Sequence, residues 1–199
     1  MFYNNSDITL YYRVYEEVNM TNITLITGGA ASGKTRWALS FFKNCDNVLI
    51  VNTGRQLTEE TVNRVNYICK TNGVDWVIMN DVKSPCDVVK DHKFYIFDSL
   101  ASYTSNVINE VCPDVNNITP EQQETVRRTV VDNVIEMMQR VEKLNGALVI
   151  ITIEPGFSVC PKDKDQILFR QILGAVNQRI ANTASEVYMS ASGIQFKIK

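Results

Sequence analysis

The sequence predicts an α/β fold in which helices flank a mostly parallel β-sheet that ends in a C-terminal antiparallel hairpin. Short apolar runs alternate with segments of helical periodicity, which is typical of strands joined by crossover helices. The chain has 199 residues, 45% of them hydrophobic and 21% charged, as expected for a globular domain of ordinary size. We therefore expect an N-terminal arm over residues 1–20 and a single domain over residues 21–199.

Seven short apolar runs are predicted to be strands: 23–27, 48–52, 76–79, 93–98, 147–153, 187–190 and 194–198. The last two are joined by a turn at Ser192-Gly193. Four periodic segments are predicted to be helices: 34–42, 59–69, 120–144 and about 164–181. The third is the clearest, with Thr119 as N-cap, Pro120 in the first turn and Gln122 completing a capping box. One face of this helix carries the apolar stripe Val126, Val130, Val134, Met137, Val141 and Leu144.

Composition excludes several classes of protein. Twenty basic and 22 acidic side chains give a net charge of −2, which argues against a nucleic-acid partner. The longest apolar run, near residues 147–153, is too short to span a membrane, and charged residues interrupt any signal-peptide core. Five widely spaced cysteines without a CxxC motif favour a reducing compartment. We expect a cytoplasmic protein.

A phosphate-binding motif follows the first predicted strand. Residues 28–35 read Gly28-Gly29-Ala30-Ala31-Ser32-Gly33-Lys34-Thr35 and fit GxxxxGK[ST]. The glycines allow the backbone to form a nest of N–H groups, and the following helix adds its N-terminal partial positive charge. Lys34 can reach the β- and γ-phosphates, and the Thr35 hydroxyl can bind Mg²⁺. The sequence therefore predicts a P-loop that binds ATP or GTP with Mg²⁺ as cofactor.

Two acidic residues end buried strands near the expected P-loop. Asp98 follows four apolar residues, as in a Walker-B strand, and is predicted to hold Mg²⁺ directly or through water. Glu154 follows the next buried strand, where it could orient the nucleophile or act as a base. For both residues, the alternative is a carboxylate that only caps the following loop.

These motifs and the C-terminal stretch resemble the adenosylcobinamide kinase / adenosylcobinamide-phosphate guanylyltransferase family of cobalamin biosynthesis. The resemblance runs from about residue 22 to residue 199 and includes the P-loop, Glu59-Glu60 with Arg64, Asp98 with Asn106, and Glu154 with Gly156 and Pro161. Its most specific part is Phe169-Arg170-Gln171-Ile172-Leu173-Gly174-Ala175-Val176-Asn177-Gln178-Arg179-Ile180-Ala181, followed by Glu186-Val187 and Ser192-Gly193-Ile194.

The resemblance implies a RecA-like P-loop fold and two reactions. The first moves the γ-phosphate of ATP or GTP to the aminopropanol hydroxyl of adenosylcobinamide, which makes a nucleotide and a corrinoid the expected small-molecule partners. The second transfers GMP from GTP to that phosphate through a guanylylated histidine. The family is usually a homo-oligomer, a trimer with sites between subunits. Lys34, Asp98 and Glu154 would be catalytic, and Thr35 and Asp98 would bind the metal.

The sequence departs from the family at the position of the guanylylated histidine. The stretch beyond Arg64 reads Val65-Asn66-Tyr67-Ile68-Cys69-Lys70 and contains no histidine. The single histidine, His92, precedes the strand that Asp98 ends, so about 16 Å of strand should separate it from the P-loop edge. The P-loop arginine of the family is replaced by Ala31, and the asparagine before the glutamate loop by Ile153.

The leading hypothesis is therefore a corrinoid kinase in which guanylyl transfer is lost or weakened. A nucleotide-binding regulatory paralogue with little turnover, or a kinase of another small alcohol, are the alternatives. Arg170, Gly174 and Asn177 fall on one helical face. Gly174 is expected to permit close helix packing, whereas Arg170 and Asn177 either bind substrate or tie down a loop. The arm carries Phe2, Tyr3, Tyr11, Tyr12 and Tyr15, and either packs on the body or docks onto another subunit.

Overall fold

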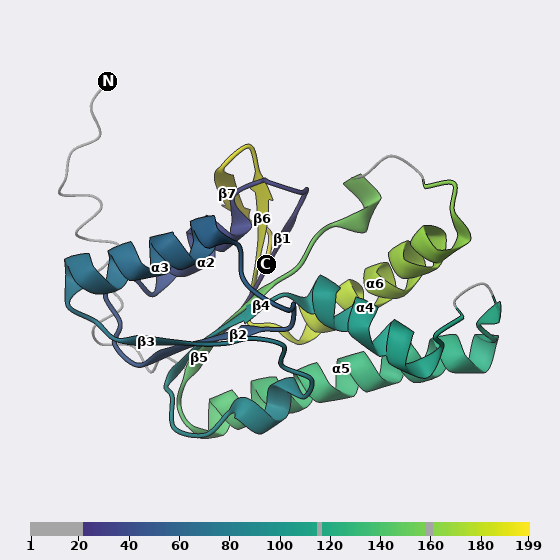
Figure 1. Ribbon diagram of the computed structural model, residues 1–199, viewed down its shortest axis with the longest axis horizontal. Coiled ribbons are helices and arrows are strands. Elements are labelled where there is room, and N and C mark those ends of the chain that lie inside the picture. Colours follow the sequence, from purple (N-terminus) through teal and green to yellow (C-terminus); the bar gives the residue numbers. More distant parts are fainter. Residues whose placement is uncertain (1–21, 115–116, 158–160) are drawn as a thin grey trace.

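The strands form one sheet in the order β3-β2-β4-β5-β1-β6-β7, in which every neighbouring pair is parallel except β6 and β7 (Figure 1). The computed structural model describes residues 22–114, 117–157 and 161–199, so the predicted arm lies outside the described residues. The strands are β1 (Asn22–Gly28), β2 (Val48–Asn52), β3 (Trp76–Met79), β4 (Phe94–Asp98), β5 (Ala147–Ile151), β6 (Glu186–Ala191) and β7 (Ile194–Lys197).

All seven predicted strands are confirmed, with ends that move by at most two residues. The largest change is in β5, which ends at Ile151 although the apolar run continues to Ile153. Beyond Ile151 the chain still runs beside β1, with the Thr152 N–H donating to the Ile26 carbonyl at 3.0 Å. Asn177 binds the same segment: the Thr152 hydroxyl donates to its Oδ1 at 2.8 Å, and its Nδ2 donates to the Ile153 carbonyl at 2.8 Å. The predicted turn at Ser192-Gly193 joins β6 to β7, with φ angles of 52° and 80°.

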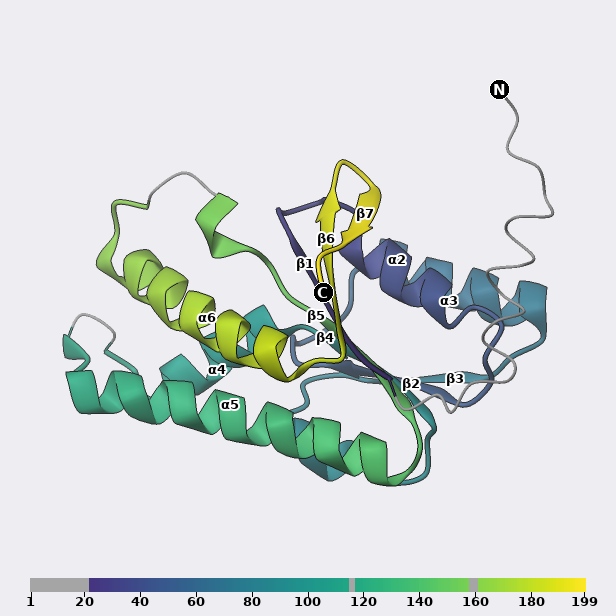
Figure 2. The same ribbon diagram turned by 180° about the vertical axis from the view of Figure 1, so that it is seen from behind.

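Helices cover both faces of the sheet, α2 and α3 on one face and α4, α5 and α6 on the other (Figures 1 and 2). The α-helices are α2 (Lys34–Phe41), α3 (Glu59–Asn72), α4 (Leu100–Val111), α5 (Pro120–Lys143) and α6 (Lys164–Thr183). The described ranges also contain the short 3₁₀ turns η1 (Pro85–Val88) and η3 (Pro155–Phe157). Among the helices in the described ranges, none has both the length and the apolar character that crossing a membrane requires.

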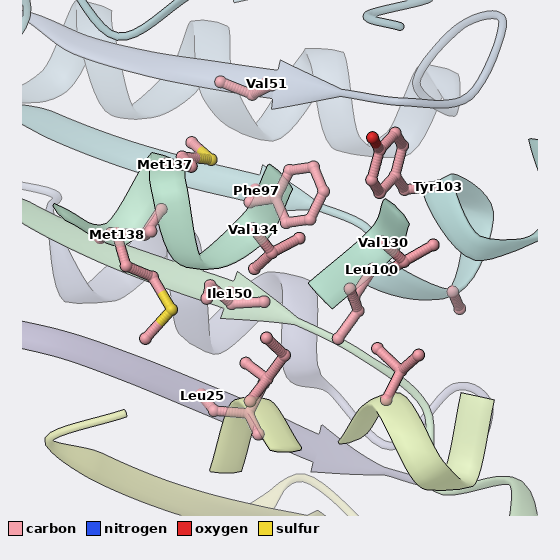
Figure 3. Close-up of a cluster of buried hydrophobic side chains, with 14 of the residues drawn as sticks. Leu25, Val51, Phe97, Leu100, Tyr103, Val130, Val134, Met137, Met138 and Ile150 are labelled. Carbon is pink, nitrogen blue, oxygen red and sulfur yellow. The ribbon is translucent and has the colours of Figure 1, made fainter. Parts of the chain in front are cut away.

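The larger core lies between the sheet and α4, α5 and α6. Helix α5 begins with the predicted capping box, since the Thr119 hydroxyl accepts from the Gln122 N–H while the Gln122 side chain accepts from the Thr119 N–H. Its apolar stripe meets side chains from four adjacent strands (Figure 3). The labelled residues are Leu25, Val51, Phe97, Leu100, Tyr103, Val130, Val134, Met137, Met138 and Ile150.

Two sequence predictions about helix packing are wrong. Leu144, assigned to the apolar stripe of α5, is the C-cap residue and is 42% exposed, because the helix ends before its side chain can turn inward. Gly174 in α6 does not mediate close helix packing, since a Cβ added there would meet no atom within 4 Å. The pattern analysis also did not predict α4, which begins two residues after Asp98.

Gly146 lies directly before β5. Among the glycines outside the P-loop, it is the one at which we expect an added methyl group to destabilise the fold most. Its Cβ would lie 2.5 Å from the carbonyl oxygen of Lys93, a backbone atom that cannot move aside freely. Gly146→Ala should therefore lower the free energy of unfolding by about 1–3 kcal/mol, as overpacking usually does. Urea denaturation measures the loss.

Gly174→Ala is the matched control for that substitution. It adds the same methyl group in open space within a helix, and should raise stability by up to about 1 kcal/mol through helix propensity. Equal stability of the two variants would contradict the steric argument.

Candidate active site

The P-loop joins β1 to α2 at the carboxyl edge of the parallel sheet. Gly28 has φ 143° and Gly33 has φ 95°, values that favour glycine, and a Cβ at Gly28 would clash with the carbonyl oxygen of Ser190 in β6. Helix α2 begins at Lys34, so its N-terminal N–H groups face the loop. The sequence folds here as the motif requires, into a backbone cradle suited to an anion.

Lys34 is buried inside this loop. Its Nζ donates to the carbonyl oxygens of Gly29 at 2.6 Å and Gly28 at 3.1 Å, and to Ser32 Oγ at 3.4 Å. Burial lowers the pKa of Lys34, and the charge of Asp98 opposes that shift. Neutral oxygens thus hold the ammonium group beside the cradle. A phosphate oxygen can replace them, because a charged acceptor forms a stronger hydrogen bond.

Asp98 ends β4 beside the P-loop, as the Walker-B pattern predicted. Burial raises its pKa to about 6, while the charge of Lys34 and a hydrogen bond from the Thr35 side chain act in the opposite direction. A hydroxyl and a carboxylate side by side are hard oxygen donors, the type that Mg²⁺ prefers when substrate phosphates supply the remaining ligands. The residues present therefore fit the predicted metal.

Two cavities open beside the P-loop, one along residues 31–36 and the other at Gly29 and Ala30. The first, of about 550 Å³, lies toward α2 and α3 and contains Lys34, Thr35 and Asp98. The second, of about 660 Å³, lies toward α6 and is mainly apolar. Both volumes suit small-molecule ligands. The lining of the second cavity is Gly29, Ala30, Ile153, Glu154, Pro155, Phe157, Pro161, Gln166, Phe169 and Arg170.

Glu154 stands between the P-loop and the second cavity. Its N–H donates to the Gly28 carbonyl at 3.1 Å, which ties the loop after β5 directly to the P-loop. Its Oε1 accepts from the Gly156 N–H at 3.3 Å, so one carboxylate oxygen caps the following turn, as the structural alternative anticipated. The same side chain lines the second cavity, and its part in phosphoryl transfer stays a prediction.

The two predicted substrate residues of α6 differ in their surroundings. Asn177 is buried and both ends of its amide bind the loop after β5, so it ties down that loop. Arg170 lines the second cavity, and its Nη1 is buried with no hydrogen-bond partner within the described structure. A buried guanidinium nitrogen in that state calls for an acceptor, which a water or a ligand can supply. Substrate binding by Arg170 remains a prediction.

Two side chains with a nitrogen that could in principle carry GMP, His92 and Lys70, lie away from the P-loop. His92 precedes β4 at the opposite edge of the sheet from Asp98, with Nδ1 3.3 Å from the Asn47 carbonyl oxygen. Lys70 is exposed in the last turn of α3.

The two apolar residues that replace polar residues of the family lie at different cavities. Ala31 is exposed at the first cavity, whereas Ile153 lines the second.

Sequence reasoning missed several residues of the site. Asn52 ends β2 at the same edge as Asp98, lines the first cavity and donates to Asn80 Oδ1 at 2.7 Å. Its position at a strand end was a usable signal, since the carboxyl ends of parallel strands share one edge. Ser102 in α4 and Gly193 in the hairpin turn also line the first cavity. Gly193 carries no local signal of this role, because only tertiary folding brings it to the loop.

An α/β sheet with a lysine-bearing anion cradle after β1 and a strand-end aspartate beside it defines the class of P-loop nucleotide-binding proteins. The family model described as "Cobinamide kinase / cobinamide phosphate guanyltransferase" matches residues 24–198, and the chain belongs to this family. The predicted family membership and the predicted RecA-like P-loop fold are thereby confirmed.

Relatives at moderate identity cover most of the chain. The bifunctional adenosylcobalamin biosynthesis protein CobU of Salmonella typhimurium is 29% identical over 182 residues, which is 88% of this chain and 98% of the relative. The protein of the same name from Escherichia coli is 25% identical, with coverages of 88% and 98%. Among solved structures, flagellar accessory protein FlaH from Methanocaldococcus jannaschii matches 96% of this chain and 84% of its own, with a TM-score of 0.50 and 14% identity. That likeness supports the fold alone.

The buried carboxylate of Asp98 is expected to cost stability in the nucleotide-free protein. Between pH 4 and 6 the folded state binds more protons than the unfolded state at this group, so stability falls as pH rises through that window. A pKa raised from 3.8 to about 6 corresponds to about 3 kcal/mol. Asp98→Asn should therefore raise the free energy of unfolding at pH 8 by up to that amount, and by much less at pH 4.

Chemical denaturation at both pH values tests this expectation. Asp132→Asn, which removes an exposed carboxylate from α5, is the control and should leave stability nearly unchanged. An Asp98→Asn protein that is less stable than the wild type at pH 8 would show that the carboxylate supports the fold.

Proposed function

We propose that this chain is a kinase that moves the γ-phosphoryl group of ATP or GTP to the aminopropanol hydroxyl of adenosylcobinamide. The observation that carries the proposal is the grouping of Lys34, Thr35 and Asp98 around a backbone cradle, with a second cavity that also contacts the P-loop. Family membership gives the substrate class, since the relatives are named as enzymes of adenosylcobalamin biosynthesis.

The nucleotide occupies the first cavity, with its phosphates against the N–H groups of residues 29–35. Lys34 leaves its carbonyl partners and contacts the β- and γ-phosphates. The negative charge of the phosphates raises the pKa of Lys34 and so favours its charged form. Thr35 and Asp98 hold Mg²⁺, which when bound neutralises charge on the phosphate oxygens. Thr35 and Asp98 take no further part in the transfer.

The acceptor enters through the second cavity. Its apolar wall, built from Ile153, Phe157 and Phe169, suits the apolar face of a corrinoid. The Arg170 Nη1, which has no partner among the described residues, suits an amide carbonyl oxygen of that ligand. Gly29 and Ala30 belong both to the P-loop and to this cavity, which brings an acceptor hydroxyl bound there next to the phosphate cradle.

Transfer then follows from positioning and charge neutralisation. The acceptor oxygen forms a bond to the γ-phosphorus as the bond from that phosphorus to the bridging oxygen breaks. The nucleoside diphosphate leaves with the bridging oxygen and its electron pair. The hydroxyl proton passes to the Glu154 carboxylate or to water, and Lys34 stabilises the charge on the transferring group.

We also propose that the chain works as a homo-oligomer, as the family resemblance implies, with a trimer as the expected form. Exposed apolar side chains on β7, Ile194 and Phe196, are consistent with burial against another subunit. Sedimentation at high micromolar concentration tests this, and a monomer there would contradict it.

The test of the proposed function is incubation with γ-labelled ATP or GTP and Mg²⁺, with and without adenosylcobinamide. We expect label on the corrinoid and nucleoside diphosphate in equal amounts. Nucleotide binding without turnover, in the presence of the corrinoid, would favour the regulatory paralogue. Transfer to other small alcohols but not to the corrinoid would instead reassign the acceptor.

A further inference from the structure

The C-terminal hairpin, formed by β6, β7 and the turn between them, is hydrogen-bonded to the P-loop. We propose that Ser190 is a positioning residue, which acts through the Ser32 carbonyl to aim the N–H of Gly33 into the phosphate cradle. This inference rests on the proposed function, since it takes the P-loop to bind a nucleoside triphosphate. Ser190 and Gly193 would then be parts of the nucleotide site that the P-loop motif does not contain.

Two donors from the hairpin meet at one carbonyl oxygen. The Ser190 hydroxyl, from β6, donates to Ser32 O at 2.7 Å, and the Gly193 N–H, from the turn, donates to the same atom at 3.0 Å. Ser190 is 1% exposed, so no water competes freely for its hydroxyl. The Ser32 carbonyl is therefore fixed on the side of the loop that faces the hairpin.

Gln195 in β7 sets the direction of the Ser190 hydroxyl. Its Nε2 donates to Ser190 Oγ at 3.2 Å and to the Gly193 carbonyl at 3.1 Å. An amide nitrogen can only donate, so Ser190 Oγ is the acceptor in that bond. The single hydroxyl proton of Ser190 is then left for Ser32, and the three hairpin residues act as one network.

Because Ser32 C=O and Gly33 N–H belong to one peptide group, fixing the carbonyl also fixes the direction of the Gly33 N–H. In a trans peptide the C=O and N–H bonds point in opposite directions, so a carbonyl held against the hairpin aims the next N–H at the cradle. Gly33 has φ 95°, and glycine tolerates more than one orientation of its peptide groups at little cost. Without the two donors, this peptide is the part of the loop that is freest to turn over.

Packing reinforces the hydrogen bonds. A Cβ on Gly33 would lie 3.3 Å from Gly193 Cα, so the turn sits directly on the loop. Gly28, at the other end of the P-loop, lies against the backbone of Ser190. The end of β6 thus fixes both ends of the phosphate cradle.

The sequence offers a selective probe of this arrangement. Ser-Gly occurs only twice in the chain, at Ser32-Gly33 and Ser192-Gly193. A protein labelled with carbonyl-¹³C serine and ¹⁵N glycine therefore gives two amide signals in a carbonyl-filtered NMR spectrum, one for each glycine of the network. Titration with inorganic triphosphate and with ATP reports the response of Gly33 and the affinity in the same experiment.

In the wild type, we expect the Gly33 signal to shift on triphosphate binding because its N–H gains an anionic acceptor. In Ser190→Ala that shift should shrink, and the dissociation constants of triphosphate and ATP should rise together by about three- to ten-fold, as loss of one orienting hydrogen bond implies. Gln195→Ala, at a partly exposed position, should give a weaker change in the same direction and serves if Ser190→Ala does not fold.

Thr24→Val is the matched control, since it removes a buried hydroxyl of the adjacent strand β1 that has no hydrogen-bond partner within the described structure. It should leave both the affinity and the Gly33 shift at the wild-type level. Ser190→Ala or Gln195→Ala proteins that are less stable, but keep wild-type affinity and the wild-type Gly33 shift, would overturn the positioning role alone. A wild-type protein whose Gly33 signal ignores triphosphate would overturn the proposed function as well.

Discussion

Lys34→Ala is expected to reduce phosphoryl transfer by about 10²–10³-fold, since it removes a preorganised charge from the point where negative charge develops. The wild-type ammonium is held at the cradle by the Gly28 and Gly29 carbonyl oxygens, so it needs little reorganisation to meet a phosphate. Most of the effect should fall on kcat, because the N–H groups of the loop still bind the phosphates. Steady-state kinetics with γ-labelled nucleotide measures the loss.

Lys70→Ala is the control for that substitution, because it removes an exposed lysine of α3 at no cost to the site. Stability provides a second readout. Burial disfavours the charge of Lys34, but its Nζ also satisfies the Gly28 and Gly29 carbonyl oxygens, so chemical denaturation must first show that Lys34→Ala folds. Unchanged affinity and turnover in Lys34→Ala would remove the P-loop from the mechanism.

The second large expected effect is the absence of a covalent GMP intermediate. Guanylylation needs an unprotonated nitrogen in line with the α-phosphate, a role that neutral imidazole fills near pH 7. The stretch after Arg64 contains no histidine, Lys70 is exposed, and His92 lies at the far edge of the sheet. Transfer of the γ-phosphoryl group needs none of these groups. We therefore expect kinase turnover without guanylyl transfer.

Incubation with α-labelled GTP and Mg²⁺, followed by denaturation, tests for acid-labile, base-stable label on the chain. The Salmonella typhimurium relative, named as a bifunctional protein of the same family, is the positive control. Stoichiometric label on this chain would show that a nucleophile has been overlooked. Mapping it to Lys70 or His92 would identify which argument failed.

Local sequence signals were sufficient for most elements of the fold and insufficient for their junctions. Strands β2 and β3 have the predicted bounds because each apolar run ends in polar or turn-forming residues. Helix α3 runs three residues past its predicted end, to Asn72, because it is Gly73, the C-cap with φ 66°, that stops the helix and not the loss of periodicity. Helix α4 escaped pattern analysis because serine, threonine and asparagine, poor helix formers, occupy much of it.

The residues of the site likewise fall into those that local sequence signals could locate and those that they could not. Lys34, Thr35 and Asp98 could be placed because strand ends and a known motif locate them. Asn177 could not be resolved from sequence, since its role depends on which loop lies opposite α6. Ser190 could not be found at all, because its partner Ser32 is 158 residues away and nothing local distinguishes its hydroxyl from any other.

Strand β1 carries the P-loop and is the first strand of the described chain, yet its two neighbours in the sheet, β5 and β6, begin at Ala147 and Glu186. During synthesis, the cradle sequence therefore leaves the ribosome long before the strands that flank it. Contacts of such large sequence separation form late, because loop closure precedes any gain from them. The nascent chain consequently has no assembled nucleotide site until β5 and β6 have been made, so nucleotide binding reports that these strands have joined β1.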